Sequence, residues 1–356
     1  MDFVVFLLCA AVIAAAGPRL VDAVDAIGEH TGISRVWLGT ILLAGATSLP
    51  ELVTTVSAGV IDEPDLAVGT VLGSNLFNMT IFGVIILSLP RAVQPDAAGL
   101  RSGLMALLLG VLVLVFLIVD APELGRVGLG SVVLIATYLM ASNLLYLRER
   151  RRTRRSLEMA AVPEMAESPG DAGPEAGDTR GANEEAAEPE VLIVPTGLSL
   201  RRAWLFLGLS SAMVFVASIF LSDSAEGIAR ELQVTGGVVG VVGVAFATSL
   251  PEVVTSVAAL RKGAAGLVVG NVFGSNIFNI AVLFPSDLAL DRGGLLRIAQ
   301  TEQAVTAGFG LLLMGLAALV LWRRMPTRAV RLTGAGILVG YLAGVIIAVA
   351  LGVDTG

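Results

Sequence analysis

The feature that most constrains the fold is a set of long apolar runs that contain no charged residue. Gly103–Val119, Ser131–Leu147 and Ala203–Leu221 hold no Asp, Glu, Lys or Arg. Each run is close to the length that a helix needs to cross a bilayer. The composition agrees, because 55% of the residues are apolar and 15% are charged, whereas a soluble domain carries about 25% charged residues. The chain is therefore predicted to be an all-α integral membrane protein.

Apolar runs of this kind predict ten transmembrane helices. They cover approximately residues 3–27, 36–60, 66–89, 102–119, 126–147, 203–222, 237–260, 266–285, 302–322 and 329–352. The first run resembles a signal peptide, but Asp2 stands where a signal peptide has basic residues. We expect this helix to be retained.

Charged residues gather between the fifth and sixth runs. Six arginines lie within 148–155, and residues 158–190 hold ten acids and one base, Arg180. This acidic segment has a charge of −9 in a chain whose net charge is −7, so the remainder carries +2. Its Pro/Gly/Ala/Glu-rich composition predicts a disordered tether, and it contains no EF-hand pattern for calcium. The overall acidity therefore says nothing about the membrane part.

The distribution of charge predicts the orientation. Cytoplasmic loops of membrane proteins carry an excess of Lys and Arg. The arginine cluster is therefore expected in the cytoplasm, with the linker cytoplasmic, both termini outside and the chain in the cytoplasmic membrane. Arg91, Arg101, Arg261, Lys262 and the four arginines within 323–331 fall on the same inner side, whereas Asp62, Glu63, Asp65, Asp120 and Glu123 fall outside.

Two motifs occur twice at one fixed spacing. Ala44–Glu51 reads Ala-Gly-Ala-Thr-Ser-Leu-Pro-Glu and returns at 245–252 with a single change. Gly73–Asn78 reads Gly-Ser-Asn-Leu-Phe-Asn and returns at 274–279, again with a single change. Between positions 44 and 78, twenty of thirty-five residues are identical to the residue 201 positions later. One register across two motifs indicates an internal duplication.

The spacing of the copies predicts their relative direction. Each motif lies five runs before its twin, with the linker in between, and because five is odd each motif crosses the membrane opposite to its twin. We therefore predict two inverted-topology five-helix repeats, an architecture of secondary transporters that bind substrate near the midplane. Residues 1–147 form the first half, 148–200 the cytoplasmic linker, and 201–356 the second half.

Each Thr-Ser-Leu-Pro-Glu segment lies inside an apolar run. Because proline lacks an N–H and clashes with the carbonyl four residues earlier, Pro50 and Pro251 predict kinks that free backbone oxygens. Glu51 and Glu252 are costly in lipid, and membrane-buried acids are usually functional. Two adjacent carboxylates repel unless a cation or a proton lies between them. The alternative is a kinked helix contact in which each glutamate is protonated.

The residue types of both motifs suit a hard cation, which prefers carboxylate, hydroxyl and carbonyl oxygens. In the second motif the Ser and Asn lie four residues apart on one helical face. The candidates from both motifs are Thr47, Ser48, Glu51, Ser74 and Asn78, with Thr248, Ser249, Glu252, Ser275 and Asn279. Gly69, Gly73, Gly270 and Gly274 are expected to allow close helix packing.

Other classes of protein fit less well. The single cysteine, Cys9, excludes an intramolecular disulfide, and the single histidine, His30, excludes a multi-histidine metal site. Neither residue lies near the motifs, which weakens the hypothesis of an intramembrane enzyme. A passive cation channel built from the same oxygens stays open. We expect no cofactor and no nucleic-acid partner; the partners are the lipid bilayer and inorganic cations.

On these motifs the chain resembles the calcium/cation antiporter superfamily, and more specifically the bacterial and archaeal sodium/calcium exchangers. The resemblance covers everything except the linker. It implies a ten-helix exchanger of Ca²⁺ and Na⁺ with sites between the second, third, seventh and eighth helices. It assigns the central acids to Glu51 and Glu252 and adds backbone-carbonyl ligands at Ala44, Thr47, Ala245 and Thr248.

Two positions depart from the family pattern. Archaeal relatives carry an aspartate where this chain has Asn279, so the predicted site has two carboxylates and not three. Two glutamates neutralise one divalent ion but not three sodium ions, which makes H⁺ an alternative coupling ion to Na⁺. In addition, Pro285 and Asp287 predict that the eighth helix ends or bends early.

Overall fold

The computed structural model describes residues 1–160, 196–231, 245–291, 294–298 and 301–353, and most of these residues are helical. Apart from helices, these ranges contain one two-stranded antiparallel sheet. The all-α membrane fold predicted from the apolar runs is confirmed. Most of the predicted disordered tether (161–195) lies outside the described residues.

The elements of the first half are α1 (Asp2–Thr31), α2 (Arg35–Leu38), the π-helical turn η1 (Gly39–Leu43), α3 (Ala44–Thr47), α4 (Leu49–Val60), α5 (Pro64–Ser88), α6 (Ala97–Ile118), β1 (Glu123–Leu124), β2 (Val127–Gly128) and α7 (Leu129–Ala160). Those of the second half are α8 (Leu200–Glu231), α10 (Ala245–Thr248), α11 (Leu250–Arg261), α12 (Ala265–Ala289), α13 (Leu295–Ile298), α14 (Thr301–Trp322) and α15 (Thr327–Val353).

Eight of the described helices are long and apolar enough to cross a membrane: α1, α5, α6, α7, α8, α12, α14 and α15. A ninth span arises if Arg35–Thr47 and Leu49–Val60 are taken together, because this bent pair passes the same test. The run predicted over 237–260 begins outside the described residues, which resume at Ala245. The structure therefore accounts for up to nine of the ten predicted spans.

The bent span has a local cause in the sequence. Ser48 leaves helical geometry at φ −92° and ψ 12°, and Pro50 starts the next helix. The two parts meet at 50°. Ser249 and Pro251 repeat this break at φ −88° and ψ 7°. Because proline suits the first turn of a helix but not its interior, the same Ser-Leu-Pro sequence breaks both copies.

The duplication is visible in the element boundaries. The helices α3, α4 and α5 begin and end 201 residues before α10, α11 and α12. Of the long helices, α5 and α12 are the most enclosed, with 83% and 89% of their apolar windows buried, compared with 17% for α7. The spacing of 201 residues between the motifs therefore also holds for the ends of the two central helices, which are equal in length.

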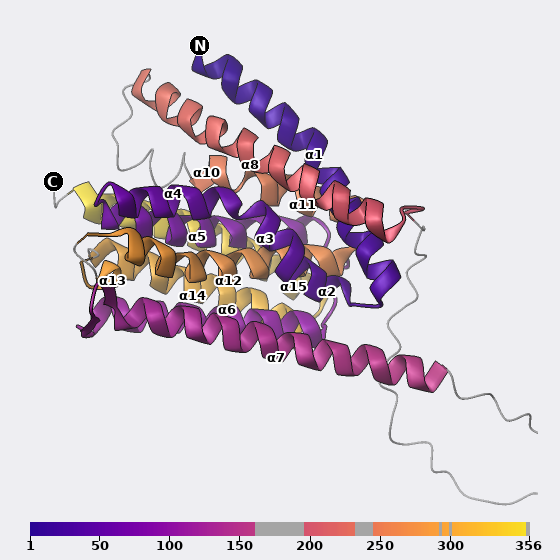
Figure 1. Cartoon of the computed structure of the whole chain (residues 1–356). Coiled ribbons are helices and arrows are strands. Elements are labelled where there is room, and N and C mark those ends of the chain that lie inside the picture. Colours follow the sequence, from indigo (N-terminus) through magenta and orange to yellow (C-terminus); the bar gives the residue numbers. More distant parts are fainter. Residues whose placement is uncertain (161–195, 232–244, 292–293, 299–300, 354–356) are drawn as a thin grey trace, which may run out of the picture.

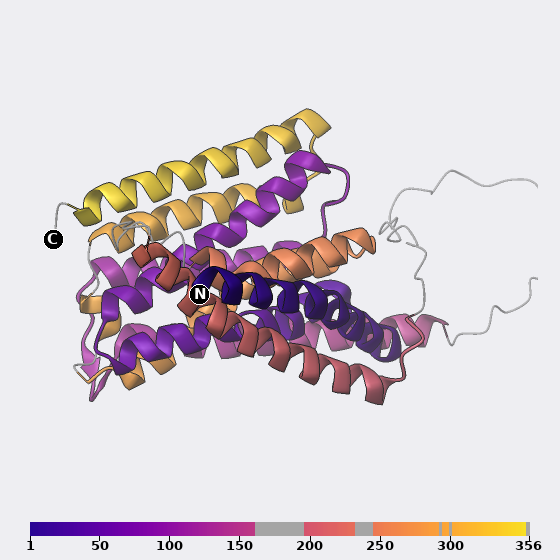
Figure 2. The same ribbon diagram turned by 90° about the horizontal axis from the view of Figure 1, so that it is seen from above.

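The remaining helices surround this centre. Figure 1 shows α1 and α8 side by side and inclined to the other helices, while α7 lies along the opposite side and extends beyond the bundle. Seen from above, α14 and α15 lie at the edge away from α1 and α8 (Figure 2). The motif-bearing helices α4, α5, α11 and α12 thus lie between the inclined pair, α1 and α8, and an outer layer formed by α7, α14 and α15.

Close packing of glycines brings the first half against α12. A Cβ atom on Gly270 would lie 2.8 Å from Gly39 Cα and 2.8 Å from Thr40 N. This contact between η1 and α12 matches the expected packing role of Gly270 and Gly274, and a methyl group at Gly270 would meet backbone rather than a movable side chain.

The eighth helix was predicted to end or bend early, and of these two alternatives the early end is wrong, because α12 continues through Pro285 to Ala289. Neighbouring elements hold this last turn: Asp287 accepts hydrogen bonds from Gly128 N and Leu295 N, both at 2.8 Å, and from the Ser131 hydroxyl. These contacts hold the end of α12 against the neighbouring elements. A second difference is that α7 extends to Ala160, so the arginine-rich segment assigned to the linker continues this helix.

Candidate functional site

The twelve residues predicted from the motifs and the resemblance lie in the interior of the protein. Their side chains come from the broken helices and from the two central helices. Eleven of them have no exposed surface, and Ala245 is 3% exposed: Ala44, Thr47, Ser48, Glu51, Ser74, Asn78, Ala245, Thr248, Ser249, Glu252, Ser275 and Asn279. The fold therefore buries two carboxyl groups together with a set of hydroxyl and amide groups.

The two halves exchange hydrogen bonds at their glutamates. Ser48 Oγ donates to Glu252 Oε1 at 2.9 Å, and Ser249 Oγ donates to Glu51 Oε1 at 3.3 Å. Ser275 Oγ also donates to Glu252 Oε1, at 3.2 Å. Because each serine binds the glutamate of the other copy, the two bonds are equivalent under exchange of the halves.

A second reciprocal pair joins the central helices α5 and α12. Asn78 Nδ2 donates to Asn276 Oδ1 at 3.0 Å, and Asn279 Nδ2 donates to Asn75 Oδ1 at 3.1 Å. Asn75 and Asn276 were not among the predicted site residues. Their identity in both copies of the Gly-Ser-Asn motif was the signal that would have identified them.

Several predicted oxygen atoms already have hydrogen-bond partners in the protein. Ala44 O accepts from Ser48 N at 2.9 Å and from Thr47 Oγ1 at 3.3 Å. Ala245 O is occupied in the same way. Ser74 Oγ and Thr248 Oγ1 are 3.4 Å apart. These groups would have to share their lone pairs with a ligand.

Four oxygen atoms of the predicted ligand residues are buried and have no hydrogen-bond partner among the described residues: Glu51 Oε2, Glu252 Oε2, Asn78 Oδ1 and Asn279 Oδ1. Each half contributes the same two atoms. A buried acceptor without a partner costs about 1–3 kcal/mol, and more if it is charged. Four such atoms at equivalent positions indicate a place for a ligand that accepts electron pairs.

A cation suits these atoms chemically. Carboxylate and amide oxygens, supplemented by hydroxyl groups, are ligands of hard cations such as Ca²⁺ and Na⁺. Among the described residues there is no group of three or more His, Cys, Asp or Glu side chains that could hold a metal ion. The set is therefore poor in charge and rich in neutral oxygens, which favours an ion that is bound and released.

One buried amide breaks the symmetry. Asn271 on α12 donates to Thr255 Oγ1 at 3.1 Å and to Ser256 Oγ at 3.3 Å, and it accepts from Thr47 Oγ1 at 3.3 Å. The equivalent residue in the first copy is Thr70. This cluster was not predicted from the sequence, because the candidate residues were those present in both copies.

Acids of α1 are tied to the bundle near one end of the site. Asp25, which is 5% exposed, accepts from Arg35 Nε at 2.7 Å and Arg35 Nη2 at 3.1 Å, and Asp22 pairs with Lys262. Asp25 is thus almost fully buried. These pairs connect α1 to the broken span and to the turn before α12.

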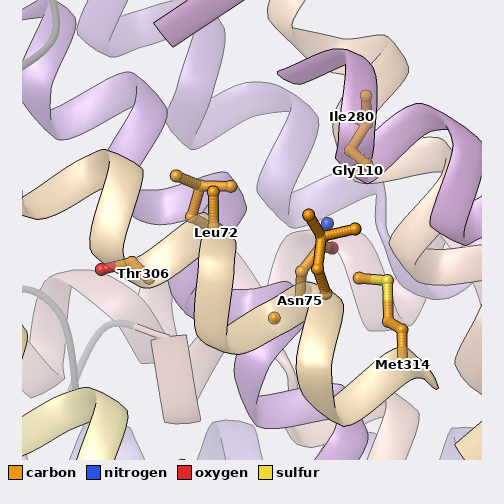
Figure 3. A pocket seen from close by; sticks show the side chains of 9 residues that line it. Leu72, Asn75, Gly110, Ile280, Thr306 and Met314 are labelled. Atoms are coloured by element: carbon orange, nitrogen blue, oxygen red, sulfur yellow. The ribbon is translucent and has the colours of Figure 1, made fainter. Parts of the chain in front are cut away.

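A small cavity lies beside the site, between the central helices α5 and α12 and their neighbours α6 and α14. It has a volume of about 10 Å³, and its walls include Leu72, Asn75, Gly110, Ile280, Thr306 and Met314 (Figure 3). This is about the space that one water molecule needs. Its mostly apolar walls distinguish it from the oxygen-rich set around the glutamates.

The model of the sodium/calcium exchanger protein family matches residues 1–147 and 202–350, which is nearly everything outside the linker. The chain belongs to the sodium/calcium exchanger family. Membership identifies it as a membrane transport protein and not an enzyme, and it confirms the family resemblance carried by the two motifs.

The chain is also similar to individual proteins. The inner membrane protein YrbG of Escherichia coli (strain K12) is 28% identical over 86% of this chain and 85% of its own length. The sodium/calcium exchanger MaX1 of Methanosarcina acetivorans is 24% identical over 80% of this chain and 81% of its own length. A solved structure of the sodium-calcium exchanger NCX_Mj matches with a TM-score of 0.69 at 22% identity, over 96% of this chain and 97% of that one, which shows a shared fold.

Proposed function

We propose that this protein is a secondary antiporter of the cytoplasmic membrane that exchanges Ca²⁺ for Na⁺ by alternating access. The observation that carries the proposal is the pair of buried glutamates in reciprocal bonds with Ser48 and Ser249, each with one oxygen atom unpartnered by any described residue. Relatives named as sodium/calcium exchangers support the choice of ions.

The proposed cation ligands are the motif residues of both halves. The carboxylates supply the charge, the amides and hydroxyls replace water in the hydration shell, and the carbonyls complete the shell where they are shared. The set is Ala44, Thr47, Ser48, Glu51, Ser74 and Asn78, with Ala245, Thr248, Ser249, Glu252, Ser275 and Asn279.

The proposed topology is ten membrane helices in two inverted repeats, with the linker in the cytoplasm and both termini outside. Reciprocal bonds between equivalent residues support a two-fold relation between the halves, and in the proposed topology an offset of five spans from each motif to its twin makes that relation an inversion. In this proposal α1 and α8 move as a pair against the motif-bearing helices and open the site to one side at a time.

Asn279 favours a second candidate, exchange of Ca²⁺ for H⁺ at the same site. Two glutamates match the charge of one Ca²⁺ or of two monovalent ions, so three sodium ions would leave an uncompensated positive charge. Two protons would neutralise the carboxylates equally well. The residues alone therefore favour two charges in each direction.

Flux measurements in everted membrane vesicles distinguish these candidates. Uptake of ⁴⁵Ca²⁺ is measured while the sodium and proton gradients are imposed independently. We expect uptake to follow an outward sodium gradient at constant pH. Uptake that follows only the pH gradient would replace Na⁺ by H⁺, and uptake that needs no counter-ion would indicate a passive channel instead.

A further inference from the structure

Two asparagines outside the proposed ligand set lie directly behind two members of it. Asn75 and Asn276 are 2% and 0% exposed, and each accepts the amide hydrogen of the ligand asparagine on the opposite central helix. The oxygen atoms of Asn78 and Asn279 are left unpartnered among the described residues.

We propose that Asn75 and Asn276 are positioning residues that turn the amide oxygens of Asn279 and Asn78 toward the transported cation. The inference rests on the proposed function and deepens it. It assigns the second motif two separate tasks: its last asparagine binds the ion, and its first asparagine decides which end of that amide the ion meets.

The physical reason lies in the asymmetry of an amide group. One end of an asparagine side chain accepts hydrogen bonds and the other end donates them. An amide turned the wrong way presents N–H groups, which repel a cation. When Asn279 Nδ2 is held by Asn75 Oδ1, its oxygen has to face the other way. An aspartate at the same position would need no such control, since both its oxygens are equivalent.

The orientation of Asn75 is itself fixed by the backbone. Its Nδ2 donates to the carbonyl oxygen of Asn276 at 3.3 Å, and a carbonyl oxygen can only accept. Asn75 therefore has to present its own oxygen to Asn279. Asn276 lacks an equivalent anchor, because its Nδ2 has no partner in the described ranges. We expect the larger effect at Asn75.

The surroundings of Asn75 agree with control by hydrogen bonds. The small cavity of about 10 Å³ lies against its side chain, between α5, α6, α12 and α14 (Figure 3). Packing therefore leaves space on this side of the amide, and the bonds to Asn276 and Asn279 hold it in place.

A double-mutant cycle tests the proposal on the purified full-length protein. The Ca²⁺ dissociation constant is measured by isothermal titration calorimetry, which needs no transport. Loss of one oriented ligand contact is expected to weaken Ca²⁺ binding about tenfold in Asn75→Ala. In an Asn279→Asp background the same substitution should change the affinity less than about twofold. In an Asn78→Asp background, the matched control, it should again cost about tenfold.

A purely structural role of Asn75 predicts an equal loss in all three backgrounds, and this result would overturn the proposal. Asn75→Ala that binds Ca²⁺ as tightly as the original protein would overturn it as well. If Asn75→Ala does not fold, the mirror cycle of Asn276→Ala with Asn78→Asp applies the same criteria. Absence of Ca²⁺ binding by the unaltered protein would contradict the proposed function itself, whatever the variants do.

Discussion

The two halves of the molecule are alike at the centre and different around it. Reciprocal bonds join Ser48 to Glu252 and Ser249 to Glu51, and both halves leave the same kinds of oxygen atom unpartnered in the described structure. Away from the glutamates, Thr70 of the first copy is replaced by Asn271. Likewise, Ile86 is replaced by Asp287.

This difference separates what the site requires from what the framework requires. The proposed ligands need both copies, because one cation has to meet equivalent groups from opposite sides. The replacements in the second copy add hydrogen bonds within it and to its neighbours: Asn271 ties α12 to α11, and Asp287 ties the end of α12 to α7 and α13. We infer that α12 is the more firmly held of the two central helices.

The largest expected effect tests whether the glutamates of the two halves contribute equally to transport. Glu51→Gln and Glu252→Gln each keep the size of the side chain but remove one of two charges, so a divalent ion is no longer neutralised. Each is expected to lower ⁴⁵Ca²⁺ exchange at least about hundredfold in everted vesicles. Glu123→Gln, at an exposed position, is the control. Normal transport by either variant, or a large difference between the two, would contradict the equivalence of the two glutamates.

Equivalent glycines provide a second test. In Gly270→Ala the new methyl group would lie 2.8 Å from the backbone of Gly39 and Thr40, whereas in Gly69→Ala the nearest atom is Gln303 Nε2 at 3.4 Å. Overpacking against rigid backbone should cost about 3 kcal/mol of stability, and the first-copy variant less than about 0.5 kcal/mol. Thermal unfolding in detergent measures both. Equal losses would show that the halves are packed equally tightly.

The repeat predicted most of the symmetric residues that lie together, although it missed Asn75 and Asn276, and it could not predict the asymmetric part of the molecule. A motif repeated in register identifies residues that face one another, so Glu51 and Glu252 were found without any coordinates. Asn271 was missed because its partners come from different segments and no repeat marks them. For Pro285 the local rule predicted an early end, whereas contacts of Asp287 across the fold hold the helix together. Such tertiary partners cannot be inferred from spacing.

Asp287 allows the framework to be tested separately from the site. Asp287→Ala would leave Gly128 N, Leu295 N and the Ser131 hydroxyl without their acceptor. A buried carboxylate with this many donors should cost about 2–3 kcal/mol when removed. Asp120→Ala, which removes an acid with a 78% exposed side chain, should change the unfolding midpoint little. Equal midpoints for the two variants would refute the anchoring of α12 by Asp287.

The smallest expected effect comes from exchanging the residues that break the symmetry. Asn271→Thr gives the second copy the residue of the first and removes the bonds to Thr255 and Ser256, which should cost about 1 kcal/mol of stability. The reverse change, Thr70→Asn, introduces the amide donor at the equivalent position of the first copy. Thr55 is the counterpart there of Ser256, and its buried Oγ1 has no partner among the described residues. This variant should be as stable as the original protein or slightly more stable. Thermal unfolding of both in one detergent decides the matter: if Thr70→Asn destabilises the protein as much as Asn271→Thr does, the polar cluster depends on features of the second copy beyond Asn271 itself.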